Sequence, residues 1–224
     1  EYEDIKGEPH AVPAANINPY LVDAPDVVLP RRSRPICDVP AIGIGSQPID
    51  DSNYLFTTEE RDAFLASEPA SAPYFHRWLG ADEFLNGYER WCLWLGDCPP
   101  NQLRSMPEVM KRVQAVKTFR LKSKRAQTLR AAGTPTHFGT ELIPRQPYIL
   151  LPKVSSERRE FIPFGFMQPD TFCSDLVFML PNGSLFHFGI LSSTMHNAWV
   201  RAVCGRLESR YRYSAAIVYN NFPW

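Results

Sequence analysis

The sequence predicts an α+β fold, with a mixed or antiparallel sheet, flanking helices and one long basic helix. Helical patterns occupy the middle and the last part of the chain, and segments rich in aromatic and β-branched residues lie between them. This order fits an α+β domain better than a parallel βαβ fold. A chain of 224 residues that is 44% hydrophobic also suffices for one large core or two small ones.

The first elements follow a long irregular start. Residues 7–48 are rich in proline and have neither a helical nor a strand hydrophobic period, so we expect extended chain and turns there. A capping box comes next, with Thr57 as the N-cap and Glu60 three residues later. It predicts a short helix through Leu65 that ends before Pro69.

Aromatic residues are dense between Tyr74 and Leu95. Because large rings contribute much of the buried area in proteins, this density is typical of a core rather than of a surface on which bases stack. Residues 91–95 are predicted to form a buried strand.

The long basic helix is predicted from residue 105 to about residue 132. Ser105 and Glu108 form a second capping box, proline lies in the first turn, and no breaker follows until Gly133. A partial apolar stripe is formed by Val109, Val113, Val116 and Leu121. The basic residues of this helix are Lys111, Arg112, Lys117, Arg120, Lys122, Lys124, Arg125 and Arg130. Between residues 120 and 130 they lie on all sides, so they cannot all find partners on one face, which favours contact with phosphate.

After Gly133 the pattern changes to strands. The predicted strands are Tyr148–Leu151, Phe161–Phe166, Phe172–Leu180 and Ser184–Ile190. Residues 181–184, Pro-Asn-Gly-Ser, predict a hairpin turn between the last two. A final helix is predicted from Ser193 to Arg206, with Gly205 near its C-cap. The apolar face of this helix is predicted to consist of Met195, Ala198, Trp199, Ala202 and Val203.

Charge is segregated along the chain although the formal net charge is zero. Residues 1–103 contain 7 Lys and Arg against 17 Asp and Glu, whereas residues 104–160 contain 13 against 4. Residues 161–224 contain 4 against 3. The basic segment is suited to a polyanion such as nucleic acid. The alternative is a solvated helix face whose acidic partners lie elsewhere in the fold.

Composition argues against several other classes of protein. Five cysteines at irregular spacing predict reduced thiols, and the spacing of Cys92 and Cys98 does not fit a structural zinc site, so we expect no metal. The sequence has no apolar run long enough to span a membrane and no secretory signal at its start, which predicts a cytoplasmic protein.

Three groups of residues resemble parts of catalytic sites. The glycine pair Gly43 and Gly45 lacks the third glycine and the following helix of a nucleotide loop. Residues 18–20, Asn-Pro-Tyr, resemble the Asn-Pro-Pro-aromatic loop of amino-methyltransferases but lack the second proline, and we treat them as a chance match.

The third group contains the residue types of a hydrolytic triad, namely Ser193, Asp175 and either His187 or His196. Nothing in their spacing requires that arrangement. His187 lies between two phenylalanines and is typical of a core histidine, whereas His196 is the more open to a functional role. We assign no catalytic residue.

Several segments, in a fixed order, resemble one known family. They are Leu151–Arg159, Ile162–Phe166, Phe186–Gly189, His196–Leu207, Tyr211–Ser214 and Tyr219–Trp224, preceded by Ile17–Leu21, Tyr88–Trp94 and Met106–Val109. This set resembles the target-recognition domain of MmeI-like adenine-specific DNA methyltransferases, and the likeness covers nearly the whole chain.

The resemblance implies that the chain is the DNA-reading part of a bacterial restriction-modification enzyme. Residues 1–20 would be a connector from an upstream methyltransferase domain of the same polypeptide, and residues 21–224 would be the recognition domain. The parent would transfer a methyl group from S-adenosylmethionine to N6 of an adenine flipped out of double-stranded DNA. Since its catalytic loop and cofactor pocket would lie before Glu1, this chain is expected to bind no cofactor and to have no catalysis of its own.

The charge pattern and the resemblance together define the expected DNA contacts. Arg120, Lys122, Lys124, Arg125 and Arg130 are assigned to phosphate contacts, which fix the register without reading sequence. Lys153, Arg158 and Arg159 lie on a turn between two predicted strands and can reach phosphates or bases. The alternative for the two arginines is an internal salt bridge to Glu157 or Glu160.

Two other functions remain as alternatives. A stand-alone hydrolase would use His196 or His187, and it requires a pocket in which one of them touches a carboxylate and a hydroxyl. A protein-docking domain would require the aromatic cluster of residues 74–94 to form an exposed apolar patch.

Overall fold

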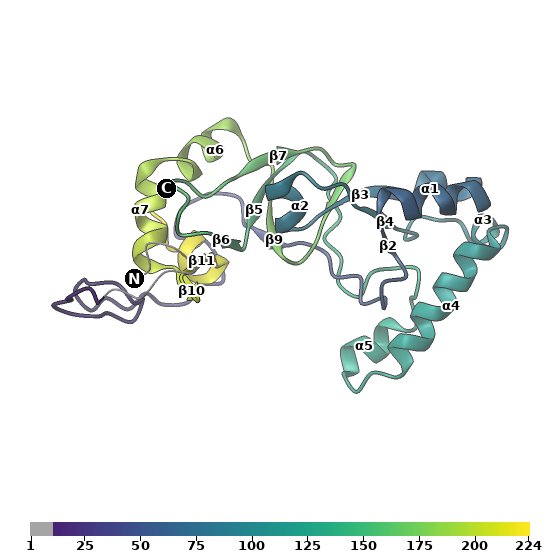
Figure 1. The fold of residues 1–224 in the computed structure, drawn as a ribbon, viewed down its shortest axis with the longest axis horizontal. Coiled ribbons are helices and arrows are strands. Elements are labelled where there is room, and N and C mark those ends of the chain that lie inside the picture. Colours follow the sequence, from purple (N-terminus) through teal and green to yellow (C-terminus); the bar gives the residue numbers. More distant parts are fainter. Residues whose placement is uncertain (1–10) are drawn as a thin grey trace.

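The structure, a computed structural model that describes residues 11–224, confirms the α+β class with three small sheets and surrounding helices (Figure 1). In the first half of the chain the elements are β1 (Gly43–Ile44), β2 (Leu55–Phe56), α1 (Thr58–Ser67), η1 (Pro69–Tyr74), β3 (Phe75–Leu79), α2 (Ala81–Asn86), β4 (Trp91–Leu93), α3 (Pro100–Arg104), α4 (Pro107–Leu121) and α5 (Ala126–Ala131). In the second half they are β5 (Tyr148–Pro152), β6 (Val154–Ser155), β7 (Gly165–Met167), β8 (Thr171–Cys173), β9 (Val177–Pro181), α6 (Leu185–Leu191), α7 (Thr194–Val203), β10 (Gly205–Leu207), β11 (Arg210–Arg212) and the π-helix η2 (Ala215–Tyr219).

The central sheet has the strand order β1-β9-β5-β7, with every pairing antiparallel. Its longest ladder joins β5 to β9, from Tyr148 opposite Pro181 to Pro152 opposite Val177. All residues of β5 are buried, as expected for a strand with a neighbour on each side and side chains covering both faces.

The second sheet, β2-β4-β3-β8, combines strands from both halves of the chain. β2, β4 and β3 pair antiparallel, and β8 then adds to β3 in parallel, with Trp78 opposite Phe172. The third sheet, β10-β11-β6, is antiparallel and lies near α7 at the other end of the molecule (Figure 1).

The dense aromatic segment lies mainly in a core, as predicted. Trp78 and Trp94 are 3% and 7% exposed, and they pack edge-on against Phe138 and Phe172 respectively. Tyr88, at 53% exposed, is an exception. The cluster therefore does not form the exposed apolar patch that the protein-docking alternative requires.

The first predicted helix is confirmed together with its cap. The backbone N–H of Glu60 donates to Thr57 Oγ1 (3.2 Å), and the backbone N–H of Thr57 donates to the Glu60 carboxylate (2.8 Å). The helix extends to Ser67, and Pro69 begins the 3₁₀ turn that follows it.

The prediction of one unbroken basic helix is wrong in two respects. α4 ends at Leu121, and α5 begins only at Ala126 after a turn at residues 122–125. The N-cap is Met106 without a side-chain cap, because the Ser105 hydroxyl donates to Gln102 O and closes α3 instead (2.7 Å).

The predicted strand at Ser184–Ile190 is also wrong, because this segment is helix α6. Asn182 adopts a left-handed conformation (φ 58°) that turns the chain after β9. Ser184 is then the N-cap residue of the helix, and its backbone N–H donates to His187 Nδ1 in the first turn (3.1 Å). The hairpin signal thus marks a real turn, but the turn leads into a helix. Likewise, only Gly165 and Phe166 of the predicted strand 161–166 lie in β7.

The last helix, α7, is confirmed with Ser193 as its N-cap, but it ends at Val203, and Arg206, the predicted last residue, lies in β10. Its predicted face is wrong in part, since Met195, Ala198 and Ala202 are exposed. The buried positions are His196, Asn197, Val200 and Val203, and Trp199 is half-buried. The buried face was missed because it contains two polar residues that hydrophobicity alone assigns to solvent.

The described part of the irregular start, residues 11–42, is extended chain and turns, as predicted. It runs along the C-terminal part of the chain, where Arg32 N donates to Ala216 O (3.0 Å) and Ile36 N donates to Asn220 O (2.9 Å). Of the predicted connector, residues 1–20, the first ten residues lie outside the part of the chain that the structure describes. Within residues 11–224, no helix combines the length and the apolar character needed to cross a membrane.

Candidate nucleic-acid interface

Helices α4 and α5 form an arm that projects from the sheets at one end of the molecule (Figure 1). Two lysines of α4, Lys111 and Lys117, are exposed, and four further exposed cations lie at the turn after α4 and on α5. We call these four the arm cations: Lys122, Lys124, Arg125 and Arg130. Within residues 11–224, none of the four forms an ion pair with a carboxylate. The turn after α4 and helix α5 therefore present four uncompensated positive charges to solvent.

The turn that carries the arm cations has a defined local structure. Arg125 is extended (ψ 121°) and is the N-cap residue of α5, and its backbone N–H donates to Ser123 Oγ (3.1 Å). Arg130 folds back along α5, where its Nε lies 3.4 Å from Ala126 O. It also borders an open hollow together with Gln127 and Thr134.

Arg120 does not belong to this surface, and the prediction that it contacts phosphate is corrected here. Its side chain is 0% exposed, and its guanidinium donates five hydrogen bonds to main-chain carbonyl oxygens. An arginine has five N–H donors, so none remains for a phosphate. The local sequence resembles that of its exposed neighbours, which is why charge counting grouped it with them.

Lys153 directly follows β5 and is half-buried. Its ammonium lies 5.1 Å from the centre of the Phe178 ring. Burial lowers the pKa of Lys153, Asp175 opposes this shift, and Arg212 adds to it. A cation that is partly desolvated and near a second cation gains from an anionic partner.

Arg158 and Arg159 lie in the loop between β6 and β7, and both are exposed. The loop turns at Ser156, whose Oγ accepts from the Arg158 N–H (3.2 Å) and whose carbonyl accepts from the Arg159 N–H (3.2 Å). Lys153 and these two arginines thus flank β6, at the end of the molecule opposite the arm (Figure 1).

The sequence analysis missed three arginines on the neighbouring strands. Arg212 is exposed on β11 and pairs with Val154 of β6, while Arg210 forms an ion pair with Glu208 (2.7 Å). Arg206 on β10 lies 4.3 Å from the centre of the Tyr211 ring. Their signal was hidden because Asp170, Asp175 and Glu208 nearly cancel the charge of residues 161–224.

The residues of the suggested hydrolytic triad do not form one. His196 is 0% exposed, and its Nε2 lies 3.1 Å from the Tyr213 hydroxyl. The Ser193 hydroxyl donates to Ile190 O and accepts from the His196 backbone, and Asp175 accepts from Gln47. The stand-alone hydrolase using His196 therefore lacks its machinery.

His187 is not a core residue as predicted but lies half-buried in the first turn of α6. Its Nδ1 lies 2.9 Å from the Ser184 hydroxyl and 3.1 Å from the Ser184 backbone nitrogen. Within residues 11–224 this histidine pairs with no carboxylate, so the hydrolase alternative fails here as well.

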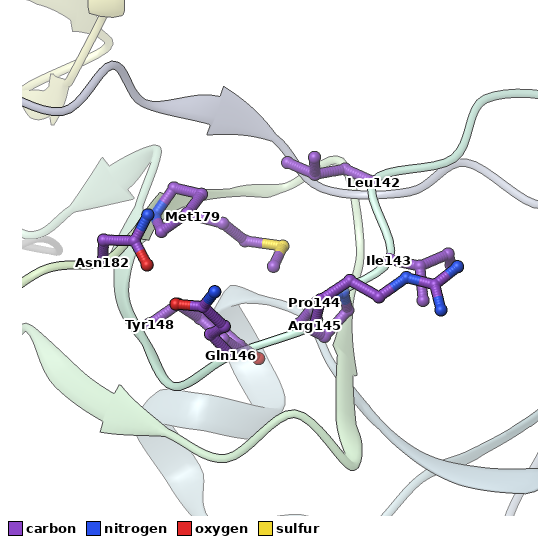
Figure 2. Close-up of a pocket in the computed structure, with 9 residues that line it drawn as sticks. Leu142, Ile143, Pro144, Arg145, Gln146, Tyr148, Met179 and Asn182 are labelled. Carbon is purple, nitrogen blue, oxygen red and sulfur yellow. The ribbon is translucent and has the colours of Figure 1, made fainter.

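A pocket of about 170 Å³ lies at the end of the β5–β9 ladder that is remote from Lys153 (Figure 2). Its lining consists of Leu142, Ile143, Pro144, Arg145, Gln146, Tyr148, Met179, Pro181 and Asn182. The Tyr148 hydroxyl donates to Thr171 O (2.7 Å), and burial raises the pKa of this tyrosine. With no histidine or carboxylate in its lining, the pocket offers no general base.

The motifs that resemble cofactor and base-binding loops have structural roles. Asn18 Oδ1 accepts from the backbone N–H of Tyr20 (2.9 Å), so the Asn-Pro-Tyr segment is a local turn. Gly43 lies in edge strand β1, and no helix follows Gly45. All five cysteines are free thiols, and the described residues contain no group of three His, Cys, Asp or Glu side chains that could hold a metal.

Residues 23–224 match the family model described as "MmeI, target recognition domain". The chain belongs to this family. The resemblance inferred from the ordered motifs is thereby confirmed. The boundary expected at residue 20 stays a prediction.

Two relatives of this MmeI-type recognition domain place it within longer proteins. It is 38% identical over 209 residues to DNA methyltransferase A of Bacillus subtilis (strain 168), covering 93% of the chain and 24% of that protein. A structure of the type IIL restriction-modification enzyme MmeI in complex with DNA matches 100% of the chain, with a TM-score of 0.93 and 49% identity, over 30% of the MmeI chain. The chain thus spans about a quarter to a third of the length of these relatives.

Proposed function

We propose that this chain binds duplex DNA and positions it for methyl transfer by a catalytic domain of the same polypeptide in a restriction-modification enzyme. The observation that carries the proposal is the match over the whole chain to MmeI, a structure solved in complex with DNA. At 49% identity and a TM-score of 0.93, the two chains share the placement of their main chains as well as the fold. The exposed, unpaired arm cations support the same conclusion.

The arm cations are suited to phosphate contacts. DNA carries a dense line of negative charge, and each Lys or Arg that meets a phosphate releases condensed counterions. Such contacts fix the position of the protein on the duplex but do not read its sequence. We therefore assign Lys122, Lys124, Arg125 and Arg130 to positioning.

The cations around β6 form a second group at the other end of the molecule. They are Lys153, Arg158, Arg159, Arg206, Arg210 and Arg212. We propose that this group contacts phosphates or base edges of the same duplex. Contacts at two separated ends fix both the register and the direction of the DNA, which a single basic patch does not.

The chemistry belongs to another part of the polypeptide. S-adenosylmethionine, bound there, would supply the methyl group for N6 of an adenine that is flipped out of the stack. Residues 11–224 do not fit that cofactor, because Gly43 lies in the edge strand β1 and no helix follows Gly45 to make a nucleotide loop. The role of this chain is to hold the duplex while the base is extruded, in the bacterial cytoplasm where such enzymes meet DNA.

The test is binding of the chain to a fluorescently labelled duplex across a salt series, measured by anisotropy. We compare wild type with the triple variant K122A/K124A/R125A. Each phosphate contact adds about 0.9 to the slope of log K against log salt, so the triple variant should lose about 2.7 of that slope. At about 0.1 M salt this corresponds to up to about 500-fold in affinity.

The matched control is Lys111→Ala, which removes one positive charge from α4, the helix that precedes the turn. Lys111 is exposed but pairs with Glu108 (2.6 Å), away from the turn that carries the arm cations. The Lys111→Ala variant should bind DNA nearly as tightly as wild type does, whereas Lys124→Ala should lower affinity about eight-fold at about 0.1 M salt. Equal losses in the two variants would contradict the placement of the contacts, and salt-independent binding by wild type would contradict the function.

A further inference from the structure

Arg120 connects the end of α4 by hydrogen bonds to several other segments of the domain. Its guanidinium donates to Ile49 O (2.9 Å) and Pro48 O (2.8 Å), in the segment between β1 and β2. The other donors reach Ala131 O (2.8 Å), Thr134 O (3.3 Å) and His137 O (2.8 Å), at the end of α5 and in the loop beyond it.

The positions of these carbonyls explain why the chain turns after Arg120. The carbonyl of Ala131 belongs to the last turn of α5, where main-chain oxygens lack helical partners and carry partial negative charge. Arg120, in the last turn of α4, binds this end of α5 and also the carbonyls of Pro48 and Ile49, and these contacts together fix the position of α5. The arm cations lie on α5 and on the turn that precedes it, so their positions are fixed as well.

No other side chain can replace these contacts in full. Lysine has three N–H donors on one point charge, whereas arginine spreads five across a rigid plane. A guanidinium that is 0% exposed and fully hydrogen-bonded holds its surroundings in one arrangement, because any shift leaves buried polar groups unpaired.

We infer that Arg120 is a positioning residue for DNA binding, which fixes the arm cations in the orientation that meets the phosphates. It touches no DNA itself. The inference rests on the proposed function and deepens it, since it names the residue through which the body of the domain controls the phosphate-binding surface.

The test compares Arg120→Lys and Arg120→Met with the matched control Arg112→Met. Arg112 also lies on α4, is half-buried over the rings of Phe56 and Phe64, and donates to Asn53 O (2.8 Å), but it is remote from the turn. All three variants should melt at lower temperature than wild type. Only the Arg120 variants should have a shallower salt slope, by about one for each phosphate that the arm no longer reaches. Each such phosphate corresponds to about eight-fold in affinity at about 0.1 M salt.

A second measurement separates positioning from general destabilisation. In the background of K122A/K124A/R125A/R130A, adding Arg120→Lys should cost little further affinity, since all four arm cations through which Arg120 acts are then absent. A further loss as large as that in the wild-type background would overturn the inference. Should Arg120→Met not fold, Arg120→Lys decides the result alone.

Hydrogen–deuterium exchange distinguishes failure of this inference from failure of the proposed function. Residues 122–137 should exchange faster in the Arg120 variants than in Arg112→Met, whether or not DNA is present. Unchanged exchange there overturns the inference. Wild-type protein that shows no salt-sensitive binding, with exchange changed as expected, would instead contradict the DNA-binding function.

Discussion

Burial of His196 makes the stability of the domain depend on pH in a predictable direction. The imidazole is 0% exposed, with Nε2 near the Tyr213 hydroxyl and Nδ1 without a hydrogen-bond partner. The Phe222 ring packs edge-on against it with 4.7 Å between ring centres. Burial lowers the pKa of His196 from 6.5 to about 4.

The sign follows from proton binding in the two states. Between pH 6.5 and about 4 the unfolded chain takes up a proton at His196 and the folded chain does not, so stability falls as the pH falls through this window. One pKa unit corresponds to about 1.4 kcal/mol, so lowering the pH to about 5 costs about 2 kcal/mol.

Urea unfolding followed by tryptophan fluorescence at about pH 7 and about pH 5 measures this loss. His196→Gln has no proton to gain, so its free energy of unfolding should fall by about 2 kcal/mol less than that of wild type between the two pH values. Taking the difference between wild type and variant cancels the other titrating groups. The same loss in both proteins would refute the reasoning.

Two further predictions concern packing. Gly45→Ala should lower stability by about 1–3 kcal/mol, because an added Cβ would lie 2.1 Å from Ser174 O. Gly43→Ala should cost less, because its Cβ meets only the end of the Leu142 side chain, and equal melting temperatures of the two variants would contradict this. Ile149 is 0% exposed and lies opposite Leu180 in the β5–β9 ladder, so Ile149→Ala should cost about 2–5 kcal/mol in urea unfolding and Ile149→Val about 0.5–1.5 kcal/mol. An alanine variant as stable as the valine variant would contradict the cost expected for an unfilled cavity.

Local signals in the sequence predicted the elements that local interactions determine. The capping box at Thr57 and Glu60 needs only four consecutive residues, and the structure has the same two hydrogen bonds. The strand at Tyr148–Leu151 was predictable because it is buried on both faces and reads as a continuous apolar run.

Long-range interactions decide the elements that were mispredicted. The turn at residues 122–125 contains neither glycine nor proline, and the contacts that accompany it join Arg120 to Pro48 and Ile49, far away in sequence. His196 was read as polar and accessible, but tertiary packing against Tyr213 and Phe222 places it inside.

The candidate interface divides in the same way. The arm cations could be predicted because a local surplus of charge without acidic neighbours has to face solvent. Arg120 could not be separated from them, since burial of a cation depends on carbonyls that other segments supply. The arginines of β10 and β11 escaped notice because a charge sum over residues 161–224 ignores how strands alternate their side chains.

Each half of the chain contributes a strand to a sheet built mainly from the other half, and this sets a condition on recombination between such domains. β1, from the first half, completes the central sheet beside β9, and β8, from the second half, completes the sheet of β3. A crossover in the loop before Tyr148 would join halves whose edge strands evolved with other partners. Because these ladders use main-chain hydrogen bonds, foreign halves can still pair, provided that small residues such as Gly45 remain at the crossing points. Evolution or engineering can therefore combine the first half of one such domain with the second half of another. The two halves would be joined by the pairing of β1 with β9 and of β3 with β8.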